Sequence, residues 1–178
     1  MVNEGTGDNF GIEMTLERKF SDNFYYMMNG TLYSSKYKAQ DGVKRNTRFD
    51  GTYAFNLLMG KEYKVGKNGK NNIFGISGKM AFAGNKRQTP INVNLSRRFN
   101  REIRLIRDTF NERLPGYFRI DLQLSFRKNK PKTTSEWRLD IQNLTNNANV
   151  VGEFYSNGRV QQNTQLGFIP ILSYRLEF

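Results

Sequence analysis

The chain has 178 residues, a size typical of one domain, and 28 Lys and Arg against 16 Asp and Glu give it a net charge of +12. It contains no cysteine and no histidine, which excludes disulfides, thiol chemistry and zinc–thiolate sites and removes the commonest general base. No stretch approaches the ~20 apolar residues of a membrane helix. No phosphate loop, catalytic carboxylate pair or metal-ligand cluster is visible either, so we expect neither an enzyme nor a cofactor site.

Apolar and polar residues alternate along several stretches of the chain. In YFRIDLQLSF (117–126), Phe118, Ile120, Leu122, Leu124 and Phe126 fall on one face and polar residues fall on the other. This period of two is typical of a β-strand with one apolar and one polar side. The pattern predicts seven strands, near residues 9–20, 24–36, 48–62, 73–84, 117–127, 136–144 and 165–178.

Short and long connections alternate between these predicted strands. The short ones are 21–23, 64–72 and 128–135, and the long ones are 37–47, 85–116 and 145–164. In an antiparallel sheet all the long connections would then lie at one end. Within 85–116, the spacing of Phe99, Ile103, Ile106 and Phe110 suits one amphipathic helix, although a short helix or hairpin inside a loop is the simpler interpretation.

Two all-β architectures fit the alternation. A soluble antiparallel barrel would place the apolar face inside, whereas a transmembrane barrel would place it against lipid and turn the polar face to the lumen. Aromatic residues near the strand ends, such as Phe118, Phe126 and Trp137, resemble the girdles of membrane barrels, and so does the asymmetry of the loops. The sequence therefore favours an antiparallel transmembrane β-barrel segment.

This choice assigns the charged alternate positions to the barrel lumen. The residues expected to face the lumen are Arg119, Asp121, Gln123, Arg138, Asp140, Gln142 and Arg175. We expect Ile120, Leu122, Leu124, Leu139 and Ile141 to face outward, together with Leu172, Tyr174 and Leu176. A proline inside a strand cannot donate to the ladder, so a bulge or a missing bond is expected at Pro170.

The last residues resemble the C-terminal recognition signal of Gram-negative outer-membrane barrels. In LGFIPILSYRLEF (166–178), the matching positions are Leu172, Tyr174, Leu176 and Phe178. The resemblance implies that the barrel-assembly machinery reads these residues.

Two further motifs resemble the C-terminal end of TonB-dependent receptors, the 22-stranded, plugged transporters of the outer membrane. They are RLPGYFRIDL (113–122) and DIQNLTN (140–146), and the similarity covers most of the chain. It implies localisation in the outer membrane of a Gram-negative cell, contact with outer-membrane lipid and uptake of a nutrient such as a ferric siderophore, cobalamin or an oligosaccharide. TonB would act only indirectly, through the plug.

The chain also departs from the family. MVNEGTGDNF at the start does not read as a signal peptide, and neither a plug domain nor a TonB box is recognisable. Seven strands do not close a single-chain barrel of even strand number. We therefore expect residues 1–178 to be about seven C-terminal strands of a larger barrel, with the plug domain and the N-terminal strands outside this chain.

Two alternatives remain open. One is a small, complete outer-membrane barrel with an unrecognised eighth strand. The other is a soluble basic β-barrel that binds nucleic acid, for which the Arg-rich segment 97–114 would be the candidate surface. Because Glu102, Asp108 and Glu112 offset the arginines of this segment, we expect no nucleic-acid partner.

Overall fold

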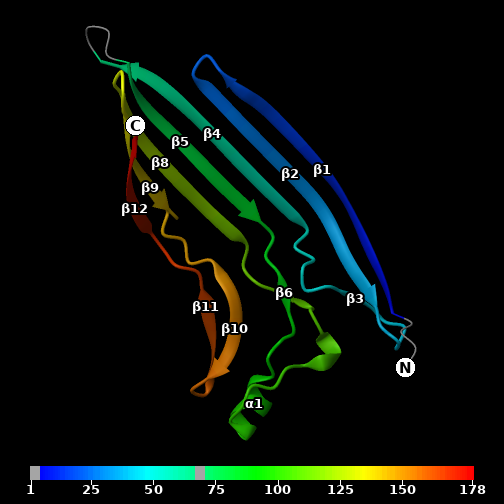
Figure 1. Ribbon diagram of the computed structural model, residues 1–178. Coiled ribbons are helices and arrows are strands. Elements are labelled where there is room, and N and C mark those ends of the chain that lie inside the picture. The colour runs from blue at the N-terminus through cyan, green and yellow to red at the C-terminus, as the bar shows by residue number, and fades with distance from the viewer. Residues whose placement is uncertain (1–4, 67–70) are drawn as a thin grey trace.

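Seven long strands form the body of the protein in a computed structural model, which describes residues 5–66 and 71–178 (Figure 1). They are β1 (Thr6–Ser21), β2 (Phe24–Lys38), β4 (Tyr53–Val65), β5 (Asn72–Ala83), β8 (Tyr117–Asn129), β9 (Thr134–Gln142) and β12 (Ile169–Glu177). Each strand is antiparallel to the next, in the order β1-β2-β4-β5-β8-β9-β12. The antiparallel all-β class is therefore confirmed, and each long strand overlaps one of the ranges predicted from the alternation.

Five shorter strands were not expected. They are β3 (Lys44–Asn46), β6 (Arg87–Gln88), β7 (Glu112–Arg113), β10 (Val150–Ser156) and β11 (Arg159–Thr164). β3 extends the edge of β2, and the other four form two separate two-stranded sheets. The bulge expected at Pro170 is absent, because the register of β12 on β9 runs without a shift from Ile169 to Glu177. β12 is an edge of the described sheet, where proline is tolerated.

The tight turns have local chemical causes. Asp22 and Asn23 both adopt positive φ, 53° and 59°, which is the backbone of a two-residue type I′ hairpin. The Lys130 N–H donates to the Thr133 carbonyl at 2.9 Å and closes the turn between β8 and β9. Residues 67–70 of the predicted turn 64–72 lie outside the described residues.

The long connections gather at the opposite end of the sheet, as expected (Figure 1). Segment 85–116 holds a short helix, α1 (Val93–Phe99), and a 3-10 turn (Ile106–Asp108). The prediction of a single amphipathic helix is wrong, because α1 ends where Asn100 adopts the left-handed conformation at φ 50°. Segment 145–164 contains the β10–β11 hairpin, whose Asn157–Gly158 turn has positive φ at both positions.

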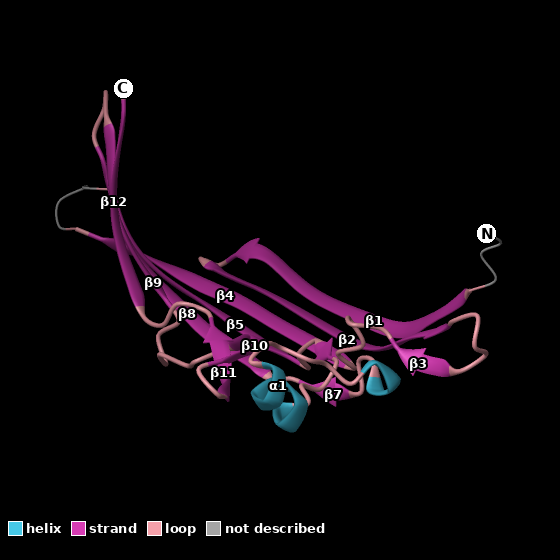
Figure 2. Ribbon diagram, turned by 90° about the horizontal axis from the view of Figure 1, so that it is seen from below, coloured by secondary structure: helices cyan, strands magenta, loops and turns pink. Residues whose placement is uncertain are grey.

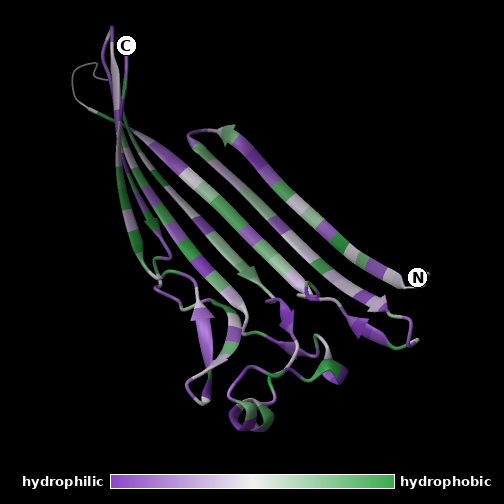
Figure 3. Cartoon of the chain, turned by 60° about the horizontal axis from the view of Figure 1, so that its bottom comes forward, coloured by the Kyte–Doolittle hydropathy of each residue, from purple (hydrophilic) through white to green (hydrophobic). Residues whose placement is uncertain are grey.

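The register keeps the apolar face continuous across the sheet, and the alternation is visible as stripes in Figure 3. Leu57 pairs with Met80, Met80 with Ile120, Leu124 with Leu139, and Leu139 with Leu172. Since paired residues of neighbouring strands share a face, these side chains form one apolar surface. A row of aromatic residues crosses this surface near the turns: Tyr63, Phe74, Phe126, Trp137 and Tyr174. A second row, Phe55, Phe82 and Phe118, lies eight residues closer to the loops.

No second layer covers the apolar face in the described part of the chain. Figure 2 shows the long strands as one curved layer. Leu114 and Val150, both at the loop end, are the only buried hydrophobic residues among those described. On the apolar face, Ile12, Met14 and Leu172 are 67%, 69% and 68% exposed. The described strands do not close into a barrel, so β1 and β12 remain edges.

Two glycines allow the connection before β4 to pass close to the end of β5. A Cβ atom on Gly84 would overlap the carbonyl oxygen of Gly51, and one on Gly51 would lie 2.6 Å from the Gly84 carbonyl oxygen. The Gly84 N–H also donates to the Tyr53 carbonyl at 2.9 Å. Only a residue without a side chain fits this contact.

We expect Gly84→Ala to destabilise the protein by more than ~1 kcal/mol, because the backbone of residue 51 must move to admit the methyl group. Gly152→Ala is the matched control, since a Cβ there meets nothing within 4 Å. Denaturant titration of both variants measures the difference. Equal stabilities would contradict the close contact.

Candidate functional site

The residues expected to face the lumen do share one face of the sheet. Gln123 pairs with Asp140, Asp121 with Lys79, and Glu136 with Arg175, so the polar positions of β5, β8, β9 and β12 lie on the side opposite the apolar surface. The structure establishes that the charges are gathered on one surface.

Four of the seven residues line a common hollow of about 230 Å³ in the middle of the polar face: Asp121, Gln123, Asp140 and Gln142. The Gln123 amide donates to Asp140 Oδ1 at 2.5 Å, and Arg119 Nε donates to Asp121 Oδ1 at 2.6 Å. Asp121 also accepts the Asn143 N–H at 2.8 Å. Arg119 therefore compensates the charge of Asp121 within β8, and the Gln123–Asp140 hydrogen bond joins β8 to β9.

Arg138 and Arg175 belong to a second cluster nearer the turns, centred on a residue that the sequence analysis missed. Glu136 is 8% exposed, and its two carboxylate oxygens accept from Arg127 at 3.4 Å and from Arg138 at 3.0 Å. Arg175 forms an ion pair with Glu177 at 2.5 Å. The alternation with Trp137 already placed Glu136 on the polar face, so the signal for it was present.

The residues of the expected assembly signal lie on the other side, along the edge strand β12. The Tyr174 ring lies 4.6 Å from the Trp137 ring, and Leu172 pairs with Leu139. Leu176 pairs with Ser135, and Phe178 follows the strand at 97% exposure. Leu172, Tyr174 and Leu176 therefore belong to the apolar surface, as their spacing predicts.

At the loop end of β8, asparagine side chains form the hydrogen bonds that a neighbouring strand would otherwise provide. The Asn149 amide donates to the Phe118 carbonyl at 2.8 Å, and its oxygen accepts the Phe118 N–H at 2.9 Å. Asn147 donates to the same carbonyl and to Asn149, while Asn143 holds the Asn147 N–H at 3.0 Å. Asn143 and Asn149 are 2% and 1% exposed. The DIQNLTN motif and the residues after it therefore fasten the β10–β11 hairpin to the end of β8.

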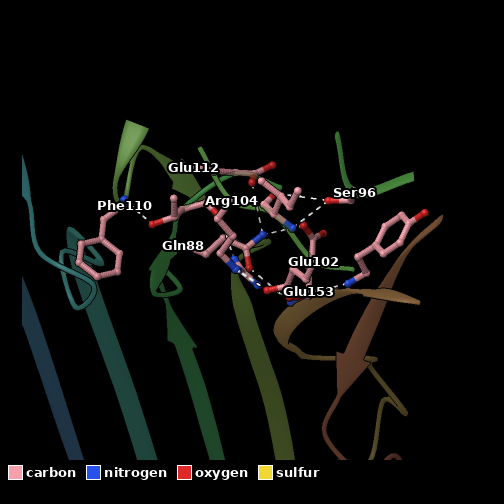
Figure 4. Close-up of polar contacts among 10 residues, drawn as sticks. Gln88, Ser96, Glu102, Arg104, Phe110, Glu112 and Glu153 are labelled. Atoms are coloured by element: carbon pink, nitrogen blue, oxygen red, sulfur yellow. Dashed lines mark hydrogen bonds and ion pairs between the residues drawn. The ribbon is translucent and has the colours of Figure 1, made fainter. Parts of the chain in front are cut away.

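A second polar network joins segment 85–116 to β10 (Figure 4). Arg104 donates from Nε to Glu102 at 2.6 Å and from its two terminal nitrogens to the carbonyls of Thr89 and Glu153, each at 2.8 Å. The Gln88 amide donates to Glu153 at 2.6 Å and to Glu112 at 3.3 Å. These contacts between distant segments give the loop end a defined shape.

A pocket of about 330 Å³ lies within this network. Its walls come from three connections and carry four cationic residues, Arg48, Lys86, Arg87 and Arg104, but only one acidic residue, Glu153. Phe110 and Leu114 supply an apolar patch. Arg87 forms an ion pair at 3.1 Å with Asp50, which is 5% exposed. A concave site that combines apolar walls with a few convergent polar groups is typical of small-molecule binding.

A neighbouring hollow near β3, of about 400 Å³, is also basic. Arg45 holds Asp41 through two contacts at 2.7 and 2.9 Å and lowers the pKa of that carboxyl to about 2. Lys44 forms an ion pair with Asp8 at 2.7 Å. Lys36 and Arg107 also line this hollow, and neither forms an ion pair within residues 5–66 and 71–178. Unlike the first pocket, it has no aromatic side chain or leucine in its walls.

Comparison with protein-family models, with curated proteins and with solved structures finds no match to this chain. Among the described residues, no helix has the length and apolar character to cross a membrane. The same residues contain no group of three or more Asp or Glu side chains arranged to hold a metal ion.

We expect Asn149→Ala to destabilise the loop end by ~1–3 kcal/mol, because it leaves the Phe118 N–H without its partner and removes one of the two amides that donate to the Phe118 carbonyl. Asn163→Ala on exposed β11 removes an amide of the same size and should have little effect. Denaturant titration gives the free energies, and limited proteolysis between residues 150 and 164 reports release of the hairpin. Unchanged proteolysis of the Asn149→Ala variant would contradict the fastening role.

Proposed function

We propose that this chain forms part of the barrel wall and extracellular loops of a TonB-dependent receptor that transports a nutrient across the outer membrane. The observation that carries the proposal is the continuous apolar surface on one face of a single-layered sheet. The family itself is proposed from the resemblance of residues 113–122, 140–146 and 166–178.

The apolar surface requires a cover. Water-exposed apolar patches on soluble monomers rarely exceed a few hundred Å², and the described residues provide almost no internal apolar core in compensation. Lipid chains match this face because apolar side chains predominate across it, with Arg18 and Lys61 as charged exceptions toward the turns, while the opposite face carries the paired charges. A soluble nucleic-acid-binding barrel is not favoured, because it would need the apolar side chains to converge on a sealed interior.

The dimensions of the strands also suit a bilayer. The seven long strands contain 9 to 16 residues, and a tilted transmembrane strand needs ~9–11. The two aromatic rows lie eight residues apart, roughly 26 Å along the strand. With strands tilted by ~40°, this spacing covers roughly 20 Å of membrane, near the ~25 Å apolar band of outer-membrane barrels. Lys61 is an exception on the apolar face, and its ammonium lies 5.4 Å from the Tyr63 ring, toward the turns.

The two edges of the sheet require partners as well. β1 presents sixteen exposed residues, and an unpaired edge of this length invites pairing with another strand. In a larger barrel, up to the 22 strands of the proposed family, the remaining strands of the same receptor would pair with β1 and β12. The charged face would then contact the lumen and the plug, through which TonB acts. The long connections would form part of the mouth for a nutrient such as a ferric siderophore, cobalamin or an oligosaccharide. We propose no enzymatic activity.

Single-cysteine labelling of the full-length protein tests this assignment, since the chain has no cysteine of its own. Spin labels at Leu122→Cys and Leu139→Cys should be accessible to oxygen dissolved in lipid. Labels at the neighbouring positions Gln123→Cys and Asp140→Cys should be shielded from lipid and more accessible to a water-soluble relaxing agent. The same accessibility at both sets of positions would overturn the lipid-facing assignment.

A further prediction concerns assembly. If Leu172, Tyr174, Leu176 and Phe178 form a recognition signal, Phe178→Ala should reduce the amount of surface-exposed protein in cells far more than it reduces refolding into lipid vesicles. The exposed ring contributes little to a finished strand. Leu95→Ala, at an exposed position on α1, is the control. Normal surface levels of the Phe178→Ala protein would refute the signal but not the barrel.

A further inference from the structure

We infer that the pocket lined by Arg48, Lys86, Arg87 and Arg104 binds a carboxylate or phosphate group. The inference deepens the proposed function, on which its physiological meaning depends, because it assigns an anionic group to the transported substrate. The argument rests on which of these cations already have partners within the protein.

Two of the four cationic side chains already form hydrogen bonds or ion pairs with other parts of the protein. Arg104 uses all three of its guanidinium nitrogens on Glu102, Thr89 and Glu153. Arg87 donates from Nε to Asp50 and from one terminal nitrogen to the Asn111 carbonyl at 3.3 Å. These two side chains shape the pocket walls and are not the ligand-binding groups.

The other two cations have no ion pair within residues 5–66 and 71–178. Arg48 is exposed and Lys86 is half-buried, and both line the pocket. The Arg87 N–H donates to the Arg48 carbonyl at 2.8 Å, which places the backbone of residue 48 beside residues 86 and 87. Two cations that line one pocket without a counter-ion favour an anion bound between them.

The one acidic residue of the pocket does not supply the missing negative charge to Arg48 or Lys86. Glu153 accepts from Gln88 at 2.6 Å through one carboxylate oxygen and from Gln162 at 3.0 Å through the other. Glutamine amides hold this carboxylate between β6 and β11 without neutralising it. Neither Arg48 nor Lys86 is among its partners, so the two cations remain available.

The chemistry of the walls indicates the kind of ligand. The planar Arg48 guanidinium can donate two parallel hydrogen bonds to a carboxylate or phosphate, and Lys86 adds a compact charge to the same pocket. Phe110 and Leu114 would contact an apolar part of the same molecule. The volume of about 330 Å³ suits one anionic group with a small attached body.

The test is calorimetric titration of the purified full-length protein with inorganic phosphate and with succinate at constant ionic strength. The double variant Arg48→Gln/Lys86→Gln should bind the better of the two anions at least ~10-fold more weakly, equivalent to ~1.4 kcal/mol. Arg101→Gln/Arg159→Gln is the matched control, since it removes two exposed cations at the loop end but outside the pocket. The control should bind within ~2-fold of the unsubstituted protein, as expected for distant, screened charges.

A stability measurement separates binding from folding. Without ligand, the pocket variant should unfold at the same or a higher temperature than the unsubstituted protein, because two cations without a counter-ion have been removed from a chain of net charge +12. The inference is overturned if neither anion binds, or if the pocket and control variants lose affinity equally.

A titration with micelles containing a phosphatidic acid distinguishes a lipid headgroup from a free solute as the source of the anion. If the pocket variant loses affinity for these micelles but the free anions bind equally to all proteins, a free anionic substrate is overturned. Failure of anion binding alongside lipid-exposed labels at position 122 would refute this inference alone. Anion binding alongside labels that never meet lipid would refute the proposed function alone.

Discussion

The structure depends on one constraint, the period-two alternation of apolar and polar residues kept in register over seven strands. Each strand on its own would bury nothing, but pairing aligns the alternate side chains into two continuous surfaces of opposite character. Backbone hydrogen bonds hold the layer together, and the apolar surface gains its stabilisation only from whatever covers it. The proposed lipid contact, the unpaired edges and the separation of charge onto one face all follow from this arrangement.

Charge is distributed unevenly along the polar side of the molecule. Within the sheet, carboxylates and cations lie on neighbouring positions and compensate one another, as with Asp121 beside Arg119 and Glu136 between Arg127 and Arg138. At the loop end, several arginines donate to backbone carbonyls, which fixes the loops but leaves positive charge uncancelled. Arg119, Arg127 and Arg138 of the sheet thus have carboxylate partners, whereas Arg48 and Lys86 at the loop end have none within the described residues.

The sequence predicted the long strands because their periodicity is local and repeats over nine or more residues. It also predicted the turn at Asp22–Asn23, since the residue types required for positive φ stand there. It missed the β10–β11 hairpin although Asn157–Gly158 between two short alternating runs is the usual signal for one. The pocket and the contacts of Asn149 could not be predicted, because they join residues more than thirty positions apart through side-chain-to-backbone bonds that leave no periodic trace.

The hydrogen bonds between Asn149 and Phe118 make the end of β8 independent of the β10–β11 hairpin. Because the asparagine side chain satisfies both backbone groups of Phe118, the end of β8 is completed by residues 143–149 and not by the hairpin that follows. The tip of that hairpin, around Asn157 and Gly158, meets α1 through a hydrogen bond from Arg97 to the Gly158 carbonyl at 3.4 Å, so a change in its length or composition affects the loops and not the strands beneath. Related proteins could diversify what they recognise by exchanging this tip, as antibodies exchange loops on a constant framework, while the strands beneath keep their register.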